Sequence, residues 1–290
     1  MRGNLSFLLK IFYHSNAVSK WAQSQTGGVS LVPTMGALHL GHLALVEKAR
    51  VVHRPVLVSI YVNPAQFNNE QDLQKYPRSI KEDLRLLQHA GVDAVYLPVT
   101  ADLYPVGLPP VSLDLGTLGQ VFEGYHRPGH FEGVVKVLHR LFSIIHPSDV
   151  FFGQKDLQQC LVVEKLITHC FQGIQQHNQP TKRDPSSGLA LSSRNMRLSE
   201  EGVKQAGAIY WALQLALIGK TLASGLAEAR EYLEKRGIQV EYLDVVSLPD
   251  MATAVALIDK KTAAVFAGYV EGVRLIDNHI YEHIPEVVVI

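Results

Sequence analysis

The sequence predicts an α/β protein with a doubly wound parallel sheet, followed by a smaller α+β domain. Strand-like and helix-like segments alternate along roughly the first 175 residues, a pattern typical of right-handed βαβ units and a parallel sheet covered on both faces. Residues 172–187 are rich in Gln, Pro, Asp and Ser and are expected to form a linker or a long active loop; after them, two helical segments precede three strand-like segments. We therefore expect two domains, residues 1–178 and 179–290, of which the second can close over the first as a lid.

The elements of the first domain are short apolar strands and helices with an apolar stripe. The clearest helical stripe covers residues 133–145 and stops before Pro147. Ser15 or Asn16 is expected to cap the first helix, and residues 1–8 are a loose extension or a misassigned start. The expected strands are 10–13, 29–32, 56–62, 92–97 and 150–152, and the expected helices are 15–23, 43–52, 79–90, 133–145 and 157–168.

The second domain has a different pattern. Residues 199–218 and 222–236 are expected to form helices. The strands expected after them, at residues 240–246, 263–270 and 273–276, have an antiparallel-looking pattern.

Composition argues against several classes of protein. Lys and Arg total 27, as do Asp and Glu, so the chain has no positive excess with which to neutralise a nucleic acid. Cys160 and Cys170 are too few for a disulfide framework, which suits the reducing cytoplasm. No apolar run reaches the ~18 residues that a membrane span requires. We therefore expect a cytoplasmic protein with no nucleic-acid or membrane partner.

The turn at residues 33–42 joins an apolar strand to a helix and holds two histidines. Ligands of open α/β sheets bind at the carboxyl ends of strands, and the free N–H groups at a helix start favour phosphate. Gly36 and Gly41 let the backbone approach a ligand closely. These features predict a nucleotide triphosphate site.

His39 and His42 are compatible with metal ligation, with a plain polar face, or with phosphate contact. No third His, Cys or carboxylate lies at ligand spacing nearby, so we expect no metal site. Gly41 between them favours phosphate contact, because His-x-Gly-His after a strand resembles the signature of the nucleotidylyltransferase superfamily. In that superfamily the histidines stabilise the charge that develops on the triphosphate.

Polar groups also follow two other strands. Asn63 and Gln66 suit a small hydroxy acid, although Asn-Pro is equally common in plain turns. Lys155 stands at a helix start, where a cation is misplaced unless it meets an anion, so we favour a phosphate contact over a solvated lysine. Asp156 is explained by the helix dipole, and Gln159 shares the face of Lys155.

A third segment that can bind anions follows Gly188. Ser192, Ser193 and Arg194 can grip phosphates through charge-assisted hydrogen bonds, although serine runs are also ordinary loop residues. Residues 123–131 add a possible anion contact in Arg127, with Glu123 as its possible partner. Neither this loop nor residues 76–78 indicates chemistry alone.

Taken together, these segments resemble the pantothenate synthetases, the pantoate–β-alanine ligases of coenzyme A biosynthesis. The matching stretches occur in the family's order between residues 33 and 278: PTMGALHLGH, VSIYVNPAQF, KYPR, EGYHRPGHFEGV, FFGQKDLQQ, GLALSSRN and RLIDN. The resemblance implies a Rossmann-like first domain, a smaller lid, and a homodimer joined through the first domains.

The resemblance also implies a reaction in two steps. The carboxylate of pantoate attacks the α-phosphorus of ATP, which enters with Mg²⁺, to give pantoyl adenylate and pyrophosphate. The amine of β-alanine then displaces AMP to give pantothenate. By motif, the catalytic residues are His39, His42, Lys155, Ser192 and Arg194, and the pantoate contacts are Asn63, Gln66 and Gln159. The ATP contacts are Met35, Gly36, His42, Gly153, Lys155, Asp156, Ser192, Ser193 and Arg194.

Two departures from the family pattern stand beside this match. Gln154 and Leu157 replace a usual glutamate and aromatic residue, and residues 183–188 are one residue longer than usual, with Ser187 in place of a common aspartate. The competing functions are another small-molecule nucleotidylyltransferase, a tRNA-binding synthetase relative and a non-catalytic binding module. Zero net charge and the lack of a Lys-Met-Ser-Lys-Ser run argue against the second, and three anion-binding segments argue against the third.

Overall fold

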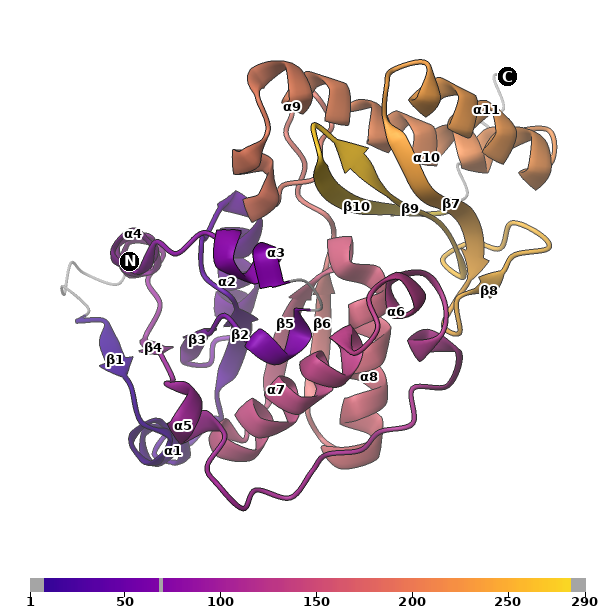
Figure 1. Ribbon diagram of the computed structural model, residues 1–290. Coiled ribbons are helices and arrows are strands. Elements are labelled where there is room, and N and C mark those ends of the chain that lie inside the picture. Colours follow the sequence, from indigo (N-terminus) through magenta and orange to yellow (C-terminus); the bar gives the residue numbers. More distant parts are fainter. Residues whose placement is uncertain (1–7, 68–69, 283–290) are drawn as a thin grey trace, which may run out of the picture. The chain divides into compact units, whose positions relative to one another are not determined.

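The protein is described by a computed structural model that covers residues 8–67 and 70–282 (Figure 1). The chain divides into two compact units, Met1–Lys182 and Arg183–Ile290. Of the expected N-terminal extension, residues 1–7 lie outside the described residues. The expected boundary after residue 178 falls inside the last strand of the first unit, which ends at Gln179.

The first unit is built on a six-stranded parallel sheet with the strand order β1-β4-β3-β2-β5-β6. Strand β2 pairs with both β3 and β5. From β2 the chain builds the sheet outward through β3 and β4 on one side, and through β5 and β6 on the other. The switch point therefore lies between β2 and β5, where open α/β sheets bind ligands. The strands are β1 (Lys10–Phe12), β2 (Ser30–Thr34), β3 (Val56–Ile60), β4 (Ala94–Tyr96), β5 (Asp149–Gly153) and β6 (Gln175–Gln179).

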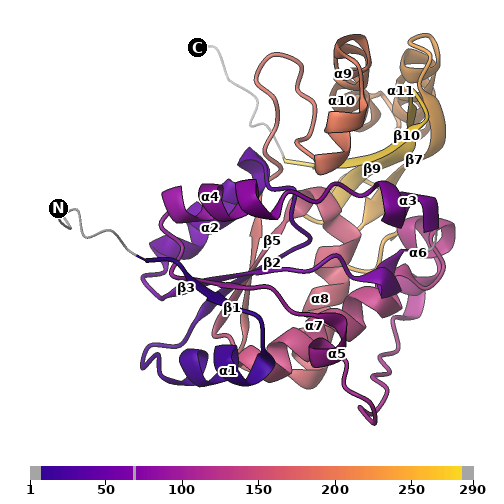
Figure 2. The same ribbon diagram turned by 60° about the vertical axis from the view of Figure 1, so that its left-hand side comes forward.

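Helices cover both faces of this sheet, which confirms the predicted fold class. Figure 2 shows α2 and α4 on one face and α1, α7 and α8 on the other. Every residue of β3 is buried, as expected for a strand with helices on both sides. The helices are α1 (Ser15–Gln23), α2 (Leu40–Val51), α3 (Glu70–Lys75), α4 (Ile80–His89), α5 (Thr100–Leu103), α6 (Phe122–His126), α7 (His130–Ile145) and α8 (Leu157–Cys170), with 3₁₀ turns η1 (Pro64–Gln66), η2 (Gly116–Gly119) and η3 (Gln154–Asp156).

Two local predictions in this unit are wrong. The sequence predicts a linker or long loop at residues 172–187, but they contain β6, a polar strand whose five residues pair with β5. Because β6 is an edge strand, it has no apolar pattern to reveal it. His14, and not Ser15 or Asn16, occupies the N-cap position of the first helix, and its side chain makes no capping hydrogen bond. The Ser15 N–H instead donates to Asp102 Oδ2 at 2.7 Å, so the acceptor comes from α5.

The second unit is the smaller α+β domain that the sequence predicts. Its antiparallel sheet has the order β10-β9-β7-β8, and α10 and α11 pack on it through a common apolar core. The elements are η4 (Ser193–Arg197), α9 (Glu200–Ala206), α10 (Ala208–Ile218), α11 (Leu222–Glu234), β7 (Gln239–Ser247), β8 (Ala252–Thr253), β9 (Thr262–Val270) and β10 (Val273–Ile280).

The prediction of one continuous helix at the start of this unit is wrong. Residues 199–218 form two helices, α9 and α10, which meet at Gly207. A Cβ at Gly207 would lie 2.6 Å from the carbonyl oxygen of Ser187, so another backbone segment passes close to the chain at the residue where the two helices meet.

In neither unit do the described residues include a helix that combines the length and apolar character of a membrane span.

Candidate active site

The predicted site residues of the first unit follow three neighbouring strands. The loop after β2 leads to His39, the turn after β3 carries Asn63 and Gln66, and the turn after β5 carries Lys155 and Asp156. Because β3, β2 and β5 are adjacent and parallel, their carboxyl ends share one edge of the sheet. The fold therefore gathers these segments at the switch point.

The loop after β2 is held in a tight turn by a buried carboxylate. Gly36 and Ala37 both adopt left-handed conformations, with φ of +82° and +50°. Asp83 of α4, only 1% exposed, accepts the N–H of Ala37 at 3.0 Å and that of Leu38 at 2.9 Å. The Ser79 hydroxyl also donates to Asp83 at 3.1 Å. Sequence reasoning missed Asp83, because nothing local shows what a residue in α4 contacts.

His39 and His42 hold each other at the start of α2. His39 Nδ1 accepts the N–H of Gly41 at 3.1 Å, and His42 Nδ1 accepts the N–H of His39 at 3.3 Å. An accepting Nδ1 carries no proton, so each neutral ring bears its proton on Nε2. Each Nε2–H is therefore the group that can donate to an anion.

Electrostatics keep both rings neutral. Burial lowers the pKa of His39 to about 4, with a further contribution from the positive charge of Lys155. Burial also lowers the pKa of His42 to about 3, with His39 contributing next. The two rings therefore act as neutral hydrogen-bond donors near pH 7, and Lys155 supplies the positive charge beside them.

This arrangement modifies the expectation that backbone N–H groups bind the phosphate. The N–H groups of Ala37 and Leu38 donate to Asp83, and those of Gly41 and His42 donate to His39. Because these donors are engaged within the protein, the side chains are the better candidates for phosphate contact.

The turn after β5 places Lys155 and Asp156 in η3, directly after Gly153. Lys155 Nζ lies 3.5 Å from Asp156 Oδ1. The Lys155 side chain is 16% exposed and that of Asp156 is 46% exposed, so the carboxylate faces solvent more than the ammonium group does. Gln159 lies one helical turn beyond Lys155 and is half-buried.

Gln66 and Asn63 form a small polar cluster with Met35. Gln66 Nε2 donates to Met35 Sδ at 2.7 Å, so the turns after β2 and β3 touch. Asn63, 1% exposed, donates from Nδ2 to Gly133 O at 3.0 Å and to Gln66 Oε1 at 3.4 Å. Its Oδ1 also accepts the N–H of Ala65 at 3.4 Å. These contacts favour the interpretation of Asn63 as an ordinary turn residue. The Gln66 side chain, in a residue that is 8% exposed, is the more available of the two amides for contact with a ligand.

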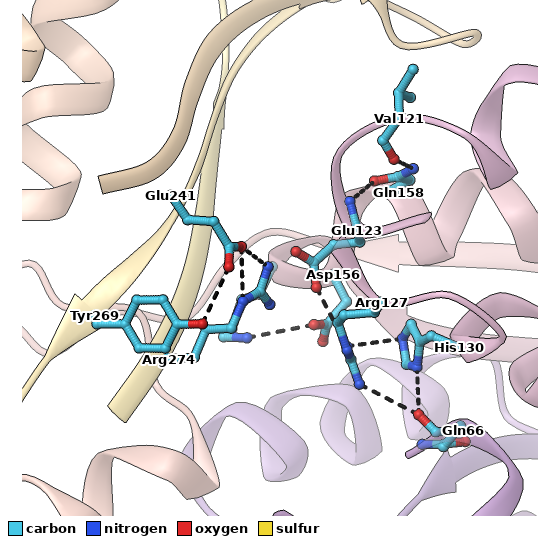
Figure 3. Close-up of polar contacts among 11 residues, drawn as sticks. Gln66, Val121, Glu123, Arg127, His130, Asp156, Gln158, Glu241, Tyr269 and Arg274 are labelled. Carbon is cyan, nitrogen blue, oxygen red and sulfur yellow. Dashed lines mark hydrogen bonds and ion pairs between the residues drawn. The ribbon is translucent and has the colours of Figure 1, made fainter. Parts of the chain in front are cut away.

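A further hydrogen-bond network surrounds the turn after β3, and sequence reasoning largely missed it (Figure 3). Arg127 pairs with Glu123 at 3.4 Å, as the sequence suggested, and also donates to His130 Nε2 at 3.1 Å. Gln158, the neighbour of Gln159, is 4% exposed and accepts the N–H of Glu123 at 3.1 Å. A run of polar residues in one motif does not tell which glutamine faces a ligand and which supports a loop.

In the second unit, Ser192 and Arg194 belong to one turn. Ser192 Oγ accepts the N–H of Arg194 at 3.2 Å and caps η4, and Ser193 is buried. The segment before this turn is anchored to β10 by Arg183, whose guanidinium forms a bidentate ion pair with Asp277 at 2.5 and 3.0 Å. This pair accounts for the Asp of the RLIDN stretch.

The lengthened segment 183–188 closes on itself. Asp184 Oδ1 accepts hydrogen bonds from the N–H and hydroxyl groups of both Ser186 and Ser187, at 2.5 to 3.0 Å. These bonds, led by the Ser186 hydroxyl, lower the pKa of Asp184 to about 2. The extra residue is therefore accommodated in a local turn, and Arg183 still pairs with Ala190 across it.

Elsewhere on the sheet of this unit, Glu241 accepts hydrogen bonds from Tyr269 at 3.2 Å and from Arg274 Nε at 3.0 Å (Figure 3). Among residues 8–67 and 70–282, no group of three or more His, Cys, Asp or Glu side chains is placed to hold a metal ion.

Comparison with known proteins identifies the family. The family described as Pantoate-beta-alanine ligase matches residues 10–280. A pantothenate synthetase of Cytophaga hutchinsonii is 43% identical over 257 residues, which cover 86% of this chain and 90% of the relative. A pantothenate synthetase of Cereibacter sphaeroides is 42% identical over 90% of this chain and 94% of its own length.

Solved structures agree with this assignment. The crystal structure of pantothenate synthetase from Thermus thermophilus has a TM-score of 0.88 and 37% identity, covering 95% of this chain and 100% of that chain. The pantoate-beta-alanine ligase of Francisella tularensis, crystallised with beta-gamma ATP and beta-alanine, has a TM-score of 0.79 and 32% identity, covering 94% of this chain and 98% of that one. The resemblance seen in the motifs is confirmed, and the chain belongs to the pantoate–β-alanine ligase family.

Proposed function

We propose that this protein condenses pantoate with β-alanine at the expense of ATP and releases pantothenate, AMP and pyrophosphate. The observation that carries the proposal is the grouping of His39, His42 and Lys155 at the switch point, beside the cluster of Gln66 and Met35. Family membership supports the same ligase activity. No covalent bond to the enzyme is needed, so catalysis rests on positioning and electrostatic stabilisation.

In the first step a carboxylate oxygen of pantoate bonds to the α-phosphorus of ATP, and pyrophosphate leaves. Negative charge grows on the phosphate oxygens as this bond forms. We propose that the Nε2–H groups of His39 and His42 donate to these oxygens and that Lys155 neutralises part of their charge. In the second step the amine of β-alanine attacks the acyl carbon and AMP leaves, with loss of a proton from nitrogen.

The remaining predicted contacts take these places in the proposal. Gln66 and Gln159 bind the hydroxyl and carboxylate groups of pantoate, because neutral amides can donate and accept hydrogen bonds. Asn63 belongs to the same site and orients the amide of Gln66. The nucleotide contacts in the first unit are Met35, Gly36, Gly153 and Asp156, in addition to His42 and Lys155.

We propose that the second unit acts as a lid that carries Ser192, Ser193 and Arg194 to the outgoing pyrophosphate. The support is the chemistry of a capped turn bearing hydroxyls and a guanidinium, which suits phosphate oxygens. Mg²⁺ would enter with ATP, held by phosphate oxygens and water, since this ion rarely uses an all-protein cage.

We also propose a cytoplasmic homodimer joined through the first units. The free thiols Cys160 and Cys170 suit a reducing compartment. Exposed apolar side chains on the first unit, such as those of Ile11, Tyr13 and Val106, are the kind that a subunit interface covers. Sedimentation equilibrium of the purified chain tests the oligomeric state directly.

Product analysis tests the proposed reaction. The protein is mixed with MgATP, pantoate and β-alanine, and nucleotides and pantothenate are followed by chromatography. We expect AMP, pyrophosphate and pantothenate in equal amounts. Steady-state AMP release without β-alanine would instead favour a nucleotidylyltransferase that stops at the adenylate, and ADP as product would exclude an adenylate mechanism.

A further inference from the structure

Residues 123–134, which run from α6 into the first turns of α7, hold the motif EGYHRPGHFEGV, to which the proposed reaction gives no role. His130 opens α7 and is 7% exposed. Its Nδ1 lies 2.8 Å from the backbone carbonyl oxygen of Gln66 (Figure 3). A carbonyl oxygen only accepts hydrogen bonds, so His130 Nδ1 must carry a proton and donate it.

The other side of the ring fixes this tautomer. Arg127 Nη1 lies 3.1 Å from His130 Nε2 and donates to it, so Nε2 holds a lone pair. Burial, followed by the positive charge of Arg127, lowers the pKa of His130 to about 4. His130 is therefore a neutral ring with its proton on Nδ1, the opposite tautomer to that of His39 and His42.

The first turn of α7 also reaches the Gln66 side chain by a second route. Gly133 lies so close to η1 that a Cβ there would be 2.3 Å from the carbonyl oxygen of Ala65. This approach lets Asn63 Nδ2 bond both to the Gly133 carbonyl oxygen, at 3.0 Å, and to Gln66 Oε1, at 3.4 Å. The backbone and the side chain of Gln66 are thus held from the same helix turn.

We propose that His130 is a positioning residue that fixes the backbone of Gln66 and so aims its amide at pantoate. Arg127, paired with Glu123, orients the imidazole for this task. The inference rests on the proposed assignment of Gln66 to pantoate. It gives the His-Phe-Glu-Gly part of the motif a function in substrate capture without contact to the substrate.

Three substitutions at His130 separate this role from simple packing. The amide nitrogen of Asn stands near the position of Nδ1 in histidine, so His130→Asn retains a donor for the Gln66 carbonyl oxygen. The longer Gln side chain places its nitrogen near the position of Nε2, so His130→Gln does not. His130→Leu removes both polar atoms. His139→Leu, on the same helix but packed edge-on against Phe171, is the matched control.

The measurement is the KM for pantoate and the KM for ATP, taken with kcat for each variant. We expect His130→Leu and His130→Gln to raise the pantoate KM about tenfold, the scale of one lost hydrogen bond, with the ATP KM within about twofold. His130→Asn should restore most of the pantoate KM, and His139→Leu should leave it unchanged.

Other outcomes overturn the proposal. Equal increases in both KM values would indicate general damage, and an unchanged pantoate KM in folded His130→Leu would show that the contact is dispensable. If His130→Leu does not fold, the comparison of His130→Asn with His130→Gln decides, and equal behaviour refutes the inference. Failure of the wild-type protein to make pantothenate would reject the proposed function itself. This outcome is distinct from failure of the inference, which is judged from differences between the variants and an active wild-type protein.

Discussion

The backbone N–H of His39 donates to Nδ1 of His42, while Nδ1 of His39 accepts the N–H of Gly41. The two histidines thus cap the helix through the Nδ1 edge of each ring and leave Nε2–H on another edge. This relationship explains how both side chains could donate hydrogen bonds to phosphate oxygens while remaining uncharged, and it leads to two predictions.

The first prediction concerns the pH dependence of stability. The folded-state pKa is lowered from 6.5 to about 4 for His39 and to about 3 for His42. Well above pH 6.5 these groups are neutral in both states. As the pH falls below 6.5, the unfolded chain binds protons that the folded chain does not, so the free energy of unfolding decreases. Urea unfolding at pH 7.5, 6.0 and 5.0 should show this decrease, before most carboxylates titrate.

Nuclear magnetic resonance of ¹⁵N-labelled imidazoles, without nucleotide, supplies the control for that prediction. Both rings should show the Nε2–H tautomer, and neither should titrate between pH 8 and pH 5. A titration of His39 or His42 near its ordinary pKa would contradict the structure.

The second prediction separates capping from catalysis at His39. Asn is a strong N-cap residue, so His39→Asn keeps an acceptor for Gly41 but loses the Nε2–H donor. We expect its melting temperature to stay close to that of the wild type, while the single-turnover rate of adenylate formation falls about 100-fold. His39→Ala should lose both stability and rate. A folded His39→Asn protein with nearly full activity would exclude His39 from phosphate contact.

A third prediction concerns Asp83, whose carboxylate holds the loop after β2. Asp83→Asn conserves shape but replaces one acceptor with an NH₂ group that faces the N–H of Ala37 or Leu38. Leaving a buried donor unsatisfied should cost about 1–3 kcal/mol of unfolding free energy. Adenylate formation should also slow, because the loop that holds Met35 and Gly36 is released. Glu82→Gln, an exposed change on the same helix, is the control and should alter neither quantity.

The fourth prediction addresses the ion pair of the second unit. The Asp277 side chain is 3% exposed and Arg183 is its bidentate partner. Arg183→Met would leave a buried carboxylate without that partner, and we expect a loss of about 3–5 kcal/mol of unfolding free energy. Lys235→Met breaks an exposed pair with Glu231 and should change the unfolding free energy far less, because solvent screens both charges. Similar melting temperatures for the two variants would show that the Arg183 pair contributes little.

Features that depend on neighbouring residues could be predicted from the amino-acid sequence. Alternating apolar strands and striped helices predict the parallel sheet, because each element must bury its own apolar side. The helical spacing from Leu43 predicts the helix after β2, although that helix begins three residues earlier, at Leu40. The ordered motifs predict the family. The strand and helix patterns each lie within a few residues, so local physics is sufficient to interpret them, whereas the family was inferred from the resemblance of motifs spread between residues 33 and 278.

The meeting of distant groups depends instead on the folded chain. Asp83 lies 46 residues from Ala37, and His130 lies 64 residues from Gln66, so no local spacing relates either pair. Strand β6 lies at the edge of the sheet, where fewer apolar side chains need to be buried, so a polar sequence is tolerated there. It forms because its backbone pairs with the hydrogen-bonding groups along the outer side of β5. Contacts of this kind arise when packed layers bring remote backbone groups together, and buried polar groups must then find the partners that the fold supplies.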